Sequence, residues 1–268
     1  MPVFCPIASG SNGNCVYAGS GDTHILFDAG MSGKRVQSSL RLINVDPEKI
    51  NAIFITHEHR DHISGAGILS RRYNIPLYAT KKTWAAMDRE TVLGPVARHN
   101  KKTVYYDNAY TVGEIVVKPF EISHDAAEPA GYSFFSGDYK VSIATDMGRA
   151  TDNVKKQLYD SDVLLLESNH DLDMLKNGSY PWPLKKRILS DTGHLSNVGC
   201  GVLITEIMSK RLKYVYLGHL SDENNRPYIA MDTVTGILEA NNIFPGKDLQ
   251  LFLADRGQIS EYLELADG

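Results

Sequence analysis

The sequence lacks the features that mark several protein classes. Its three cysteines, Cys5, Cys15 and Cys200, form no CxxC pair and are odd in number, which fits buried thiols in a reducing compartment. No segment approaches the roughly 20 apolar residues that a membrane-spanning helix needs. The N-terminus has no basic stretch followed by an apolar run, as a signal peptide would have. We therefore expect a cytoplasmic protein with no membrane partner.

An excess of basic residues is also missing. The formal net charge is −4, so a polyanion would have to be held by a local patch or by metal ions. Hydrophobic residues make up 43% and charged residues 22%, as in ordinary globular proteins. No linker rich in proline, serine or glycine divides the chain. We expect one domain over residues 1–268.

Segments with the apolar period of a helix alternate along the chain with segments that have the pattern of a strand. Residues 16–20 and 24–30 read as a hairpin around glycines, 34–45 as a helix and 50–56 as a buried strand. The middle third alternates polar and apolar residues, as antiparallel strands do, and the last third repeats helix and strand. This order predicts an α/β fold with two sheets packed face to face and helices outside, a four-layer αββα sandwich.

The densest group of potential metal ligands is THEHRDH at residues 56–62. If the chain stays extended here, His57 and His59 point to the same side. Asp61 and His62 open the next helix and face elsewhere, so one pair cannot easily serve the ion of the other. Imidazole and carboxylate ligands suit zinc, manganese or iron, whereas structural zinc sites more often use cysteines. The segment predicts a partly open catalytic site for two metal ions.

Three further potential ligands occur where predicted strands end. His124 follows KPFEIS, Asp146 follows KVSIAT and His219 follows KYVYLG. A solvated charged loop is the alternative interpretation of THEHRDH, and these distant groups argue against it.

THEHRDH and these downstream residues resemble the HxHxDH signature and later motifs of the metallo-β-lactamase superfamily. The resemblance covers nearly the whole chain and implies the fold of that superfamily. It implies that Asp28, in the motif LFDAG, orients the metal loop through hydrogen bonds, although a plain turn aspartate is the alternative. It assigns ligands to two metals, bridged by Asp146: His57, His59 and His124 for one, and Asp61, His62 and His219 for the other.

The fold does not name the bond that is cleaved. Two cations about 3.5 to 4 Å apart can lower the pKa of a shared water, so hydrolysis by a metal-bridging hydroxide is expected. Relatives in the superfamily act on lactams, thioesters, lactones and phosphodiesters. In nucleic-acid-processing branches a histidine before the last ligand contacts the scissile phosphate or protonates the leaving oxygen. The resemblance thus implies that His194 is a general acid, which makes Asp61 and His194 the predicted catalytic residues; a structural histidine is the alternative.

Other residues are predicted to face the site. Ser196 or Asn197 could cap the helix after His194, and a helix N-terminus suits a phosphate. Asn224 lies just past His219, and Glu167 ends a strand and could orient His194. We predict substrate contacts at Ser196, Asn197 and Asn224.

The order of ASGSNGNC, FDAG, THEHRDH, ESNHD, GHLSN and HLSDENN is similar to the YycJ/WalJ branch of the superfamily. That branch implies a 5′-to-3′ exonuclease on double-stranded DNA that prefers manganese and has a suspected part in mismatch repair. We expect a metal-dependent exodeoxyribonuclease that binds DNA 5′ ends and holds two divalent ions, Mn²⁺ or Zn²⁺, with Fe²⁺ also open.

Basic residues could hold a DNA backbone, and Trp182 beside one basic run could stack on a terminal base. Solvated charges and a packed tryptophan are the favoured interpretation. The basic candidates are Arg71, Arg72, Lys81, Lys82, Lys101, Lys102, Lys185, Lys186 and Arg187.

Two other functions remain open at this point. One is a small-molecule hydrolase of a thioester, lactone or cyclic nucleotide, which predicts a closed apolar pocket. The other is a regulatory metal-binding protein linked to cell-wall signalling, against which the complete ligand set argues. The native metal and the oligomeric state are not fixed by the sequence.

Overall fold

The structure is a computed structural model that describes residues 1–265. The chain divides into two compact units, each with its own hydrophobic core. Unit 1 comprises Met1–Pro119, Ala126–Tyr139 and Asp255–Gly268, and unit 2 comprises Phe120–Asp125 and Lys140–Ala254. The single domain expected over residues 1–268 stays a prediction.

Unit 1 contains a seven-stranded sheet in the order β14-β1-β2-β3-β4-β5-β6. Strands β1 to β3 are antiparallel, and β3 to β6 are parallel. The bounds of these strands are β1 (Pro2–Ala8), β2 (Cys15–Ser20), β3 (Thr23–Phe27), β4 (Ala52–Phe54), β5 (Leu77–Thr80), β6 (Lys101–Val104) and β14 (Leu263–Glu264). Unit 1 also holds β7 (Tyr110–Val112), β8 (Ile115–Glu121), which runs on into unit 2, and β9 (Ala130–Ser136).

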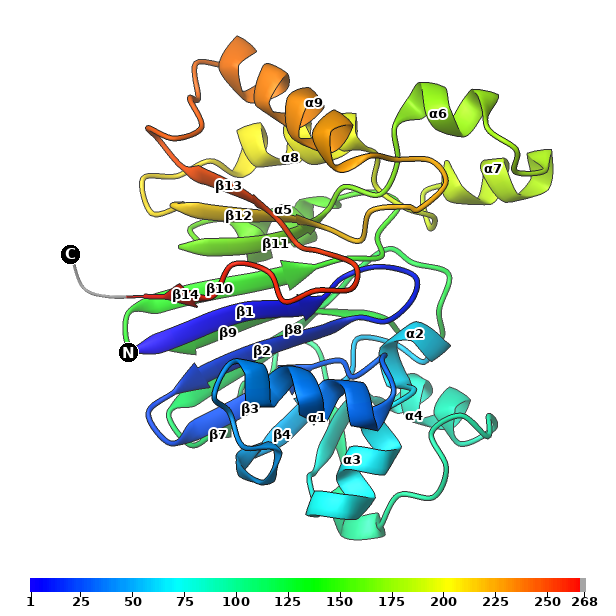
Figure 1. The fold of residues 1–268 in the computed structure, drawn as a ribbon, viewed down its shortest axis with the longest axis vertical. Helices are drawn as coiled ribbons and strands as arrows, with labels where there is room; N and C mark the ends of the chain where they lie inside the picture. Colours follow the sequence, from blue (N-terminus) through cyan, green and yellow to red (C-terminus); the bar gives the residue numbers. More distant parts are fainter. Residues whose placement is uncertain (266–268) are drawn as a thin grey trace. The chain divides into compact units, whose positions relative to one another are not determined.

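The helices of unit 1 lie beside its parallel strands (Figure 1). Their bounds are α1 (Gly33–Leu42), η1 (Pro47–Lys49), α2 (Arg60–Ile63), α3 (Ala66–Tyr73), α4 (Lys81–Met87) and η2 (Arg98–Asn100). Val36 and Leu40, one turn apart on α1, are both fully buried, as the helical spacing predicts. The predicted hairpin is confirmed as β2 and β3, with Gly21 at φ 53° in the turn.

Unit 2 is a parallel βα arrangement. Its strands pair in the order β13-β12-β11-β10, and helices α8 and α9 contact each other beside them (Figure 1). The bounds are β10 (Tyr139–Ala144), β11 (Val163–Glu167), β12 (Tyr214–Gly218), β13 (Gln250–Leu253), α5 (Asp152–Leu158), α6 (Leu172–Asn177), α7 (Trp182–Ile188), α8 (Asn197–Ile207) and α9 (Pro227–Ala240). The short pair α6 and α7 is an element that the sequence analysis did not predict.

One predicted strand is shorter than expected. The apolar run at residues 50–56 forms β4 over Ala52–Phe54 only. The backbone N–H of Thr56 donates to Oδ1 of Asp28 at 2.8 Å, so a side chain replaces the next backbone partner. The chain therefore leaves the sheet just before the histidine cluster. Among the described residues, the structure has no helix that is long and apolar enough to cross a membrane.

Candidate metal centre

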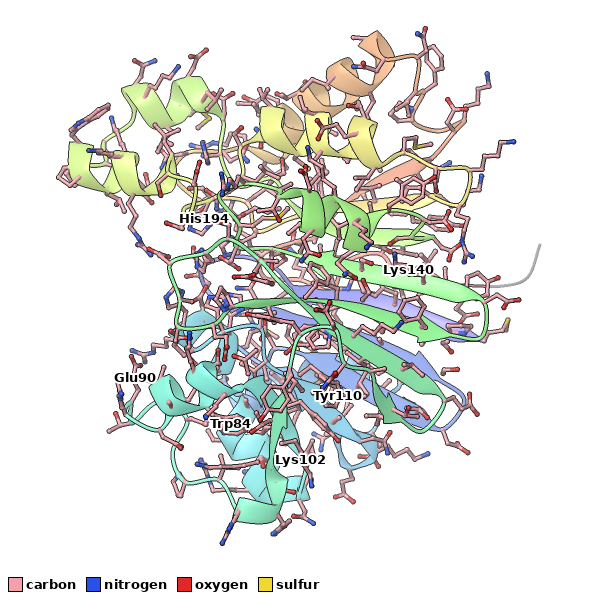
Figure 2. The ribbon with its side chains drawn as sticks, turned by 180° about the vertical axis from the view of Figure 1, so that it is seen from behind. Trp84, Glu90, Lys102, Tyr110, Lys140 and His194 are labelled. Carbon is pink, nitrogen blue, oxygen red and sulfur yellow. The ribbon has the colours of Figure 1, made fainter. Side chains whose placement is uncertain are left out.

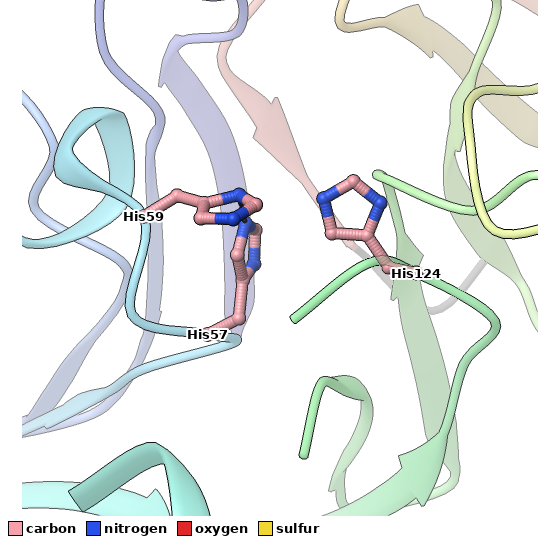
Figure 3. A group of neighbouring side chains, drawn as sticks. All are labelled: His57, His59 and His124. Atoms are coloured by element: carbon pink, nitrogen blue, oxygen red, sulfur yellow. Dashed lines mark hydrogen bonds between the residues drawn. The ribbon is translucent and has the colours of Figure 1, made fainter. Parts of the chain in front are cut away.

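The histidine cluster of unit 1 lies directly after β4. His57 and His62 are fully buried, and His59 is partly buried. Nε2 of His57 lies 2.9 Å from Nδ1 of His59, and the two rings meet edge to face (Figure 3). Asp61 and His62 stand on α2, with Oδ2 of Asp61 3.5 Å from Nε2 of His62. Unit 1 thus brings together all four predicted ligands of the THEHRDH segment.

Asp28 contacts this cluster on the Nδ1 side of His62. Its Oδ2 lies 2.7 Å from Nδ1 of His62 and accepts from Oγ1 of Thr56 at 2.8 Å. The same hydroxyl is 3.0 Å from Nδ1 of His57. Because Asp28 and Thr56 occupy the Nδ1 sides, each of these histidines has Nε2 as its candidate metal-binding atom. These contacts fit the orienting role that the resemblance implies for Asp28, which stays a prediction.

Asn14 also reaches the cluster, through contacts that the sequence does not reveal. Its Nδ2 lies 3.3 Å from Oδ2 of Asp61 and 3.0 Å from Nε2 of His62. Its backbone N–H donates to the carbonyl of Asp61 at 2.7 Å, and its carbonyl accepts from Gly30 at 2.7 Å. The loop SGSNGN, residues 9–14, could line the mouth of the site through its backbone amides, but its glycines and serines favour a simple turn as the interpretation of the sequence.

Gly30 is fixed by close packing against the metal loop, and we expect Gly30→Ala to destabilise the protein by about 2 kcal/mol. A Cβ at this position would overlap the backbone carbonyl of Asp61, which cannot swing away as a side chain would. Chemical denaturation measures the loss. The matched control is Gly236→Ala on α9, where a Cβ meets nothing within 4 Å and helix propensity favours alanine. Equal stability of the two variants would contradict the packing argument.

In unit 2, side chains gather where the parallel strands β10, β11 and β12 end. Glu167 is the last residue of β11, His219 follows β12 directly, and Asp146 lies two residues beyond β10. Ligand atoms of these three residues and of His194 all lie within 4.8 Å of one another. The carboxyl ends of parallel neighbours share one edge of a sheet, so the predicted positions at strand ends do meet within this unit.

The backbone at these strand ends is unusual. Asp28, Asp146 and His219 adopt φ values of 58°, 57° and 54°, in the left-handed region that residues other than glycine seldom occupy. Such conformations persist where surrounding contacts enforce them, and they cluster at functional sites.

Glu167 is the central acceptor of the unit 2 group. It is fully buried, and its Oε1 lies 2.7 Å from Nδ1 of His194 and 2.9 Å from Nδ1 of His219. Oε2 accepts from the backbone N–H groups of Met147 and Leu195 at 2.8 and 3.1 Å. Burial alone would raise the pKa of Glu167, but the charges and hydrogen bonds of His194 and His219 outweigh it and lower the pKa to about 2.

His194 lies between two other histidine rings of unit 2. His194 is partly exposed (Figure 2), and its ring lies 5.3 Å from that of His219 and 5.4 Å from that of His124. Burial lowers the pKa of His124. Its Nδ1 lies 3.3 Å from the carbonyl of Gly193, so Nε2 is its candidate metal-binding atom.

The predicted substrate contacts occupy different environments. Ser196 caps α8 by accepting from the N–H of Gly199 at 3.0 Å, which confirms the predicted cap. Asn197 is buried and bonded to Ser168 and Asn225 at 2.7 and 3.0 Å. Asn224 is also buried. A role for Ser196, Asn197 and Asn224 in substrate binding stays a prediction.

The donor atoms of both units are of the kinds that divalent metal ions bind. Unit 1 offers His57, His59, Asp61 and His62. Unit 2 offers His124, Asp146, His194 and His219 around Glu167. Neutral imidazoles and carboxylates of this kind bind zinc, manganese or iron. Hydrogen bonds at Nδ1, which present Nε2 to a cation, are the usual support of metal-binding histidines.

Several of the basic residues considered for DNA contact are bonded within the protein. Arg71 donates to the carbonyls of Leu93 and Pro95, and Arg72 donates to Gln37. Lys101 pairs with Asp88. Lys102, Lys186 and both lysines at the start of α4 are exposed. The expectation of a packed Trp182 is wrong, because its side chain is 67% exposed at the start of α7.

Comparisons with known proteins show which family the chain matches and which proteins it is similar to. The family described as "Beta-lactamase superfamily domain" matches residues 23–216. The chain is 42% identical to "Exodeoxyribonuclease WalJ" of Streptococcus pneumoniae serotype 2, with 92% of this chain and 91% of that protein covered. It is 37% identical to "Exodeoxyribonuclease YycJ" of Bacillus anthracis, with 94% and 95% covered.

A solved structure supports the fold. The metallo-β-lactamase fold protein YhfI of Bacillus subtilis matches with a TM-score of 0.70 and 19% identity, over 96% of this chain and 98% of that one. A likeness at this identity bears on the fold alone. It confirms the α/β metallo-β-lactamase fold expected from the sequence.

Proposed function

This chain belongs to the β-lactamase superfamily and is similar to YycJ and WalJ. We propose that it is a metal-dependent exodeoxyribonuclease that degrades double-stranded DNA from 5′ ends. The family expected from the sequence is thereby confirmed. The two relatives named exodeoxyribonucleases cover nearly the whole chain, and they supply the DNA substrate of the proposal.

One observation in the structure carries the proposal. A single buried carboxylate, Glu167, contacts Nδ1 of both His194 and His219 beside Asp146. His219 and Asp146 have the chemistry of metal ligands, whereas His194 is the more exposed of the two histidines. Hydrolysis of a phosphodiester needs a proton donor for the leaving oxygen as well as a nucleophile. Glu167 holds His194 at Nδ1, which leaves Nε2 as the atom that would deliver this proton.

We assign two divalent cations to the site, with the ligands that the superfamily resemblance implies. When bound, they supply a nucleophile at neutral pH and stabilise the charge that develops on the attacked group. Asp28 and Glu167 orient the ligands, and Asp61 is both ligand and catalytic residue. Manganese or zinc is the proposed metal. A part in mismatch repair and a cytoplasmic location stay predictions.

The proposed function is tested with duplex DNA labelled at either end. We expect manganese-loaded protein to shorten the DNA stepwise, so that a 5′ label is released at once as a short product and a 3′ label stays on a shrinking strand. A chelator in excess should stop the reaction, and added Mn²⁺ should restore it. DNA left intact by protein with measured bound metal would contradict the proposal and favour a small-molecule hydrolase. Early release of the 3′ label would reverse the polarity.

A further inference from the structure

The segment α6–α7, residues Leu172–Ile188 of unit 2, carries an exposed aromatic side chain among basic residues. Trp182 is 67% exposed, whereas the other tryptophan of the chain, Trp84, is 6% exposed and donates to the carbonyl of Lys102. Tryptophan is enriched where proteins contact partners, because its large ring buries much apolar area in one contact. Tryptophan also offers the largest face for stacking.

The surroundings of Trp182 give it a fixed position. Pro181 and Pro183 flank it and restrict the backbone at the start of α7. Lys185 is buried, and its Nζ donates to the carbonyls of Lys176 and Gly178 at 2.8 and 2.7 Å. This ammonium joins α7 to the end of α6. These contacts restrict the position of the Trp182 ring.

The same segment is connected to the catalytic histidine. The backbone N–H of His194 donates to the carbonyl of Ile188 at 2.9 Å, and that of Gly193 donates to Ser190 at 2.9 Å. The backbone of His194 is thus hydrogen-bonded to the last turn of α7. Trp182 precedes Ile188 by six residues, which is about 9 Å along a helix.

The charge of the segment differs from that of the chain. Leu172–Ile188 holds four basic residues and one acidic residue, Asp173, whereas the whole chain has a net charge of −4. Lys186 is exposed, and Arg187 pairs with Asp125. The exposed lysines Lys176 and Lys186 beside an exposed aromatic ring fit the combination of charge and stacking that binds unpaired nucleic-acid strands. Electrostatics and stacking here favour the same partner.

From these observations we infer that α6–α7 is a platform for an unpaired DNA strand, with Trp182 stacking on a base and Lys186 contacting the backbone. This inference rests on the proposed function and specifies how that site takes its substrate.

The expected result for Trp182→Ala is a roughly tenfold weaker binding of duplex DNA with an unpaired 5′ end, since stacking contributes about 1 to 3 kcal/mol per base. Trp182→Phe should keep most of the affinity. The matched control is Tyr228→Ala on α9, which removes an aromatic side chain that is 66% exposed in the same unit and should leave binding unchanged. Anisotropy with metal-free protein measures binding without degradation.

Tryptophan fluorescence gives an independent readout. DNA should quench the wild-type emission, and the quenching should be absent from Trp182→Phe, because Trp84 is buried. Lys186→Ala should reduce the slope of log affinity against log salt by about 1. Unchanged DNA binding by Trp182→Ala would overturn the inference, as would unchanged quenching in Trp182→Phe. If the wild type degrades DNA in those cases, the proposed function stands and only the platform fails.

Discussion

Replacing Asp61 and His62 together with alanine is expected to lower DNA degradation by about 10³-fold. A bound metal contributes several kcal/mol to the stabilisation of the transition state, and each 1.4 kcal/mol corresponds to a factor of ten. The two residues are neighbours on α2, and Asp28 and Asn14 support them. Their loss removes a carboxylate and an imidazole from one side of the cluster and leaves His57 and His59 in place.

The measurement pairs a rate assay with the metal content of each purified protein. We expect the double variant to bind fewer equivalents of Mn²⁺ than the wild type and to remain folded by circular dichroism. The matched control is Asp88→Ala with His99→Ala, which removes the same two residue types from exposed positions of unit 1. Degradation by the double variant at more than a tenth of the wild-type rate would show that these side chains do not hold a catalytic metal.

The positions of the candidate ligands could be predicted because strand ends are visible in the sequence. Apolar runs end just before His57 and His219 and shortly before Asp146, and within unit 2 the parallel strands β10 to β12 bring their carboxyl ends to one edge. The buried run DVLLLES likewise placed Glu167 at the end of β11. The period of the apolar residues and the residues that end a strand are local signals, and the predicted strand ends follow from these signals.

Other features depend on contacts between distant residues and left no local signal. The left-handed turns at Asp28 and His219 follow from what surrounds them, because neither residue type requires that conformation. Asn14 is one of several polar residues in a glycine-rich loop, and only the fold carries it to Asp61. Trp182 was expected to pack, but its side chain is 67% exposed.

The second large effect is expected from Glu167→Gln, which preserves the shape of the side chain and removes its charge. Each carboxylate oxygen accepts from two donors: Oε1 lies against His194 and His219, and Oε2 against two backbone N–H groups. A glutamine has one accepting oxygen and one NH₂ group. We expect the variant to lose about 3 kcal/mol of unfolding free energy, because a buried charge network is broken on one side. DNA degradation should fall about 100-fold.

The activity should fall in either orientation of the new amide. If its NH₂ group faces the backbone donors, two buried N–H groups lose their acceptor and the turn at Met147 and the segment at Leu195 shift. If it faces the imidazoles, His219 must accept at Nδ1 and so carries its proton on Nε2, where it cannot bind a cation. Metal titration separates these cases, since only the second weakens metal binding in a well-folded protein.

Glu206→Gln provides the control for this substitution, because Glu206 lies on the surface of α8, pairs with Lys155 at 3.0 Å and should cost less than about 0.5 kcal/mol. Thermal melting, metal affinity and rate are compared in the two variants. A Glu167→Gln protein with wild-type metal affinity and rate would mean that the carboxylate is a structural acceptor for Met147 and Leu195 alone. The orientation of both histidines would then have to come from Asp146, whose Oδ1 lies 3.3 Å from Nδ1 of His219 and 3.6 Å from Nδ1 of His194.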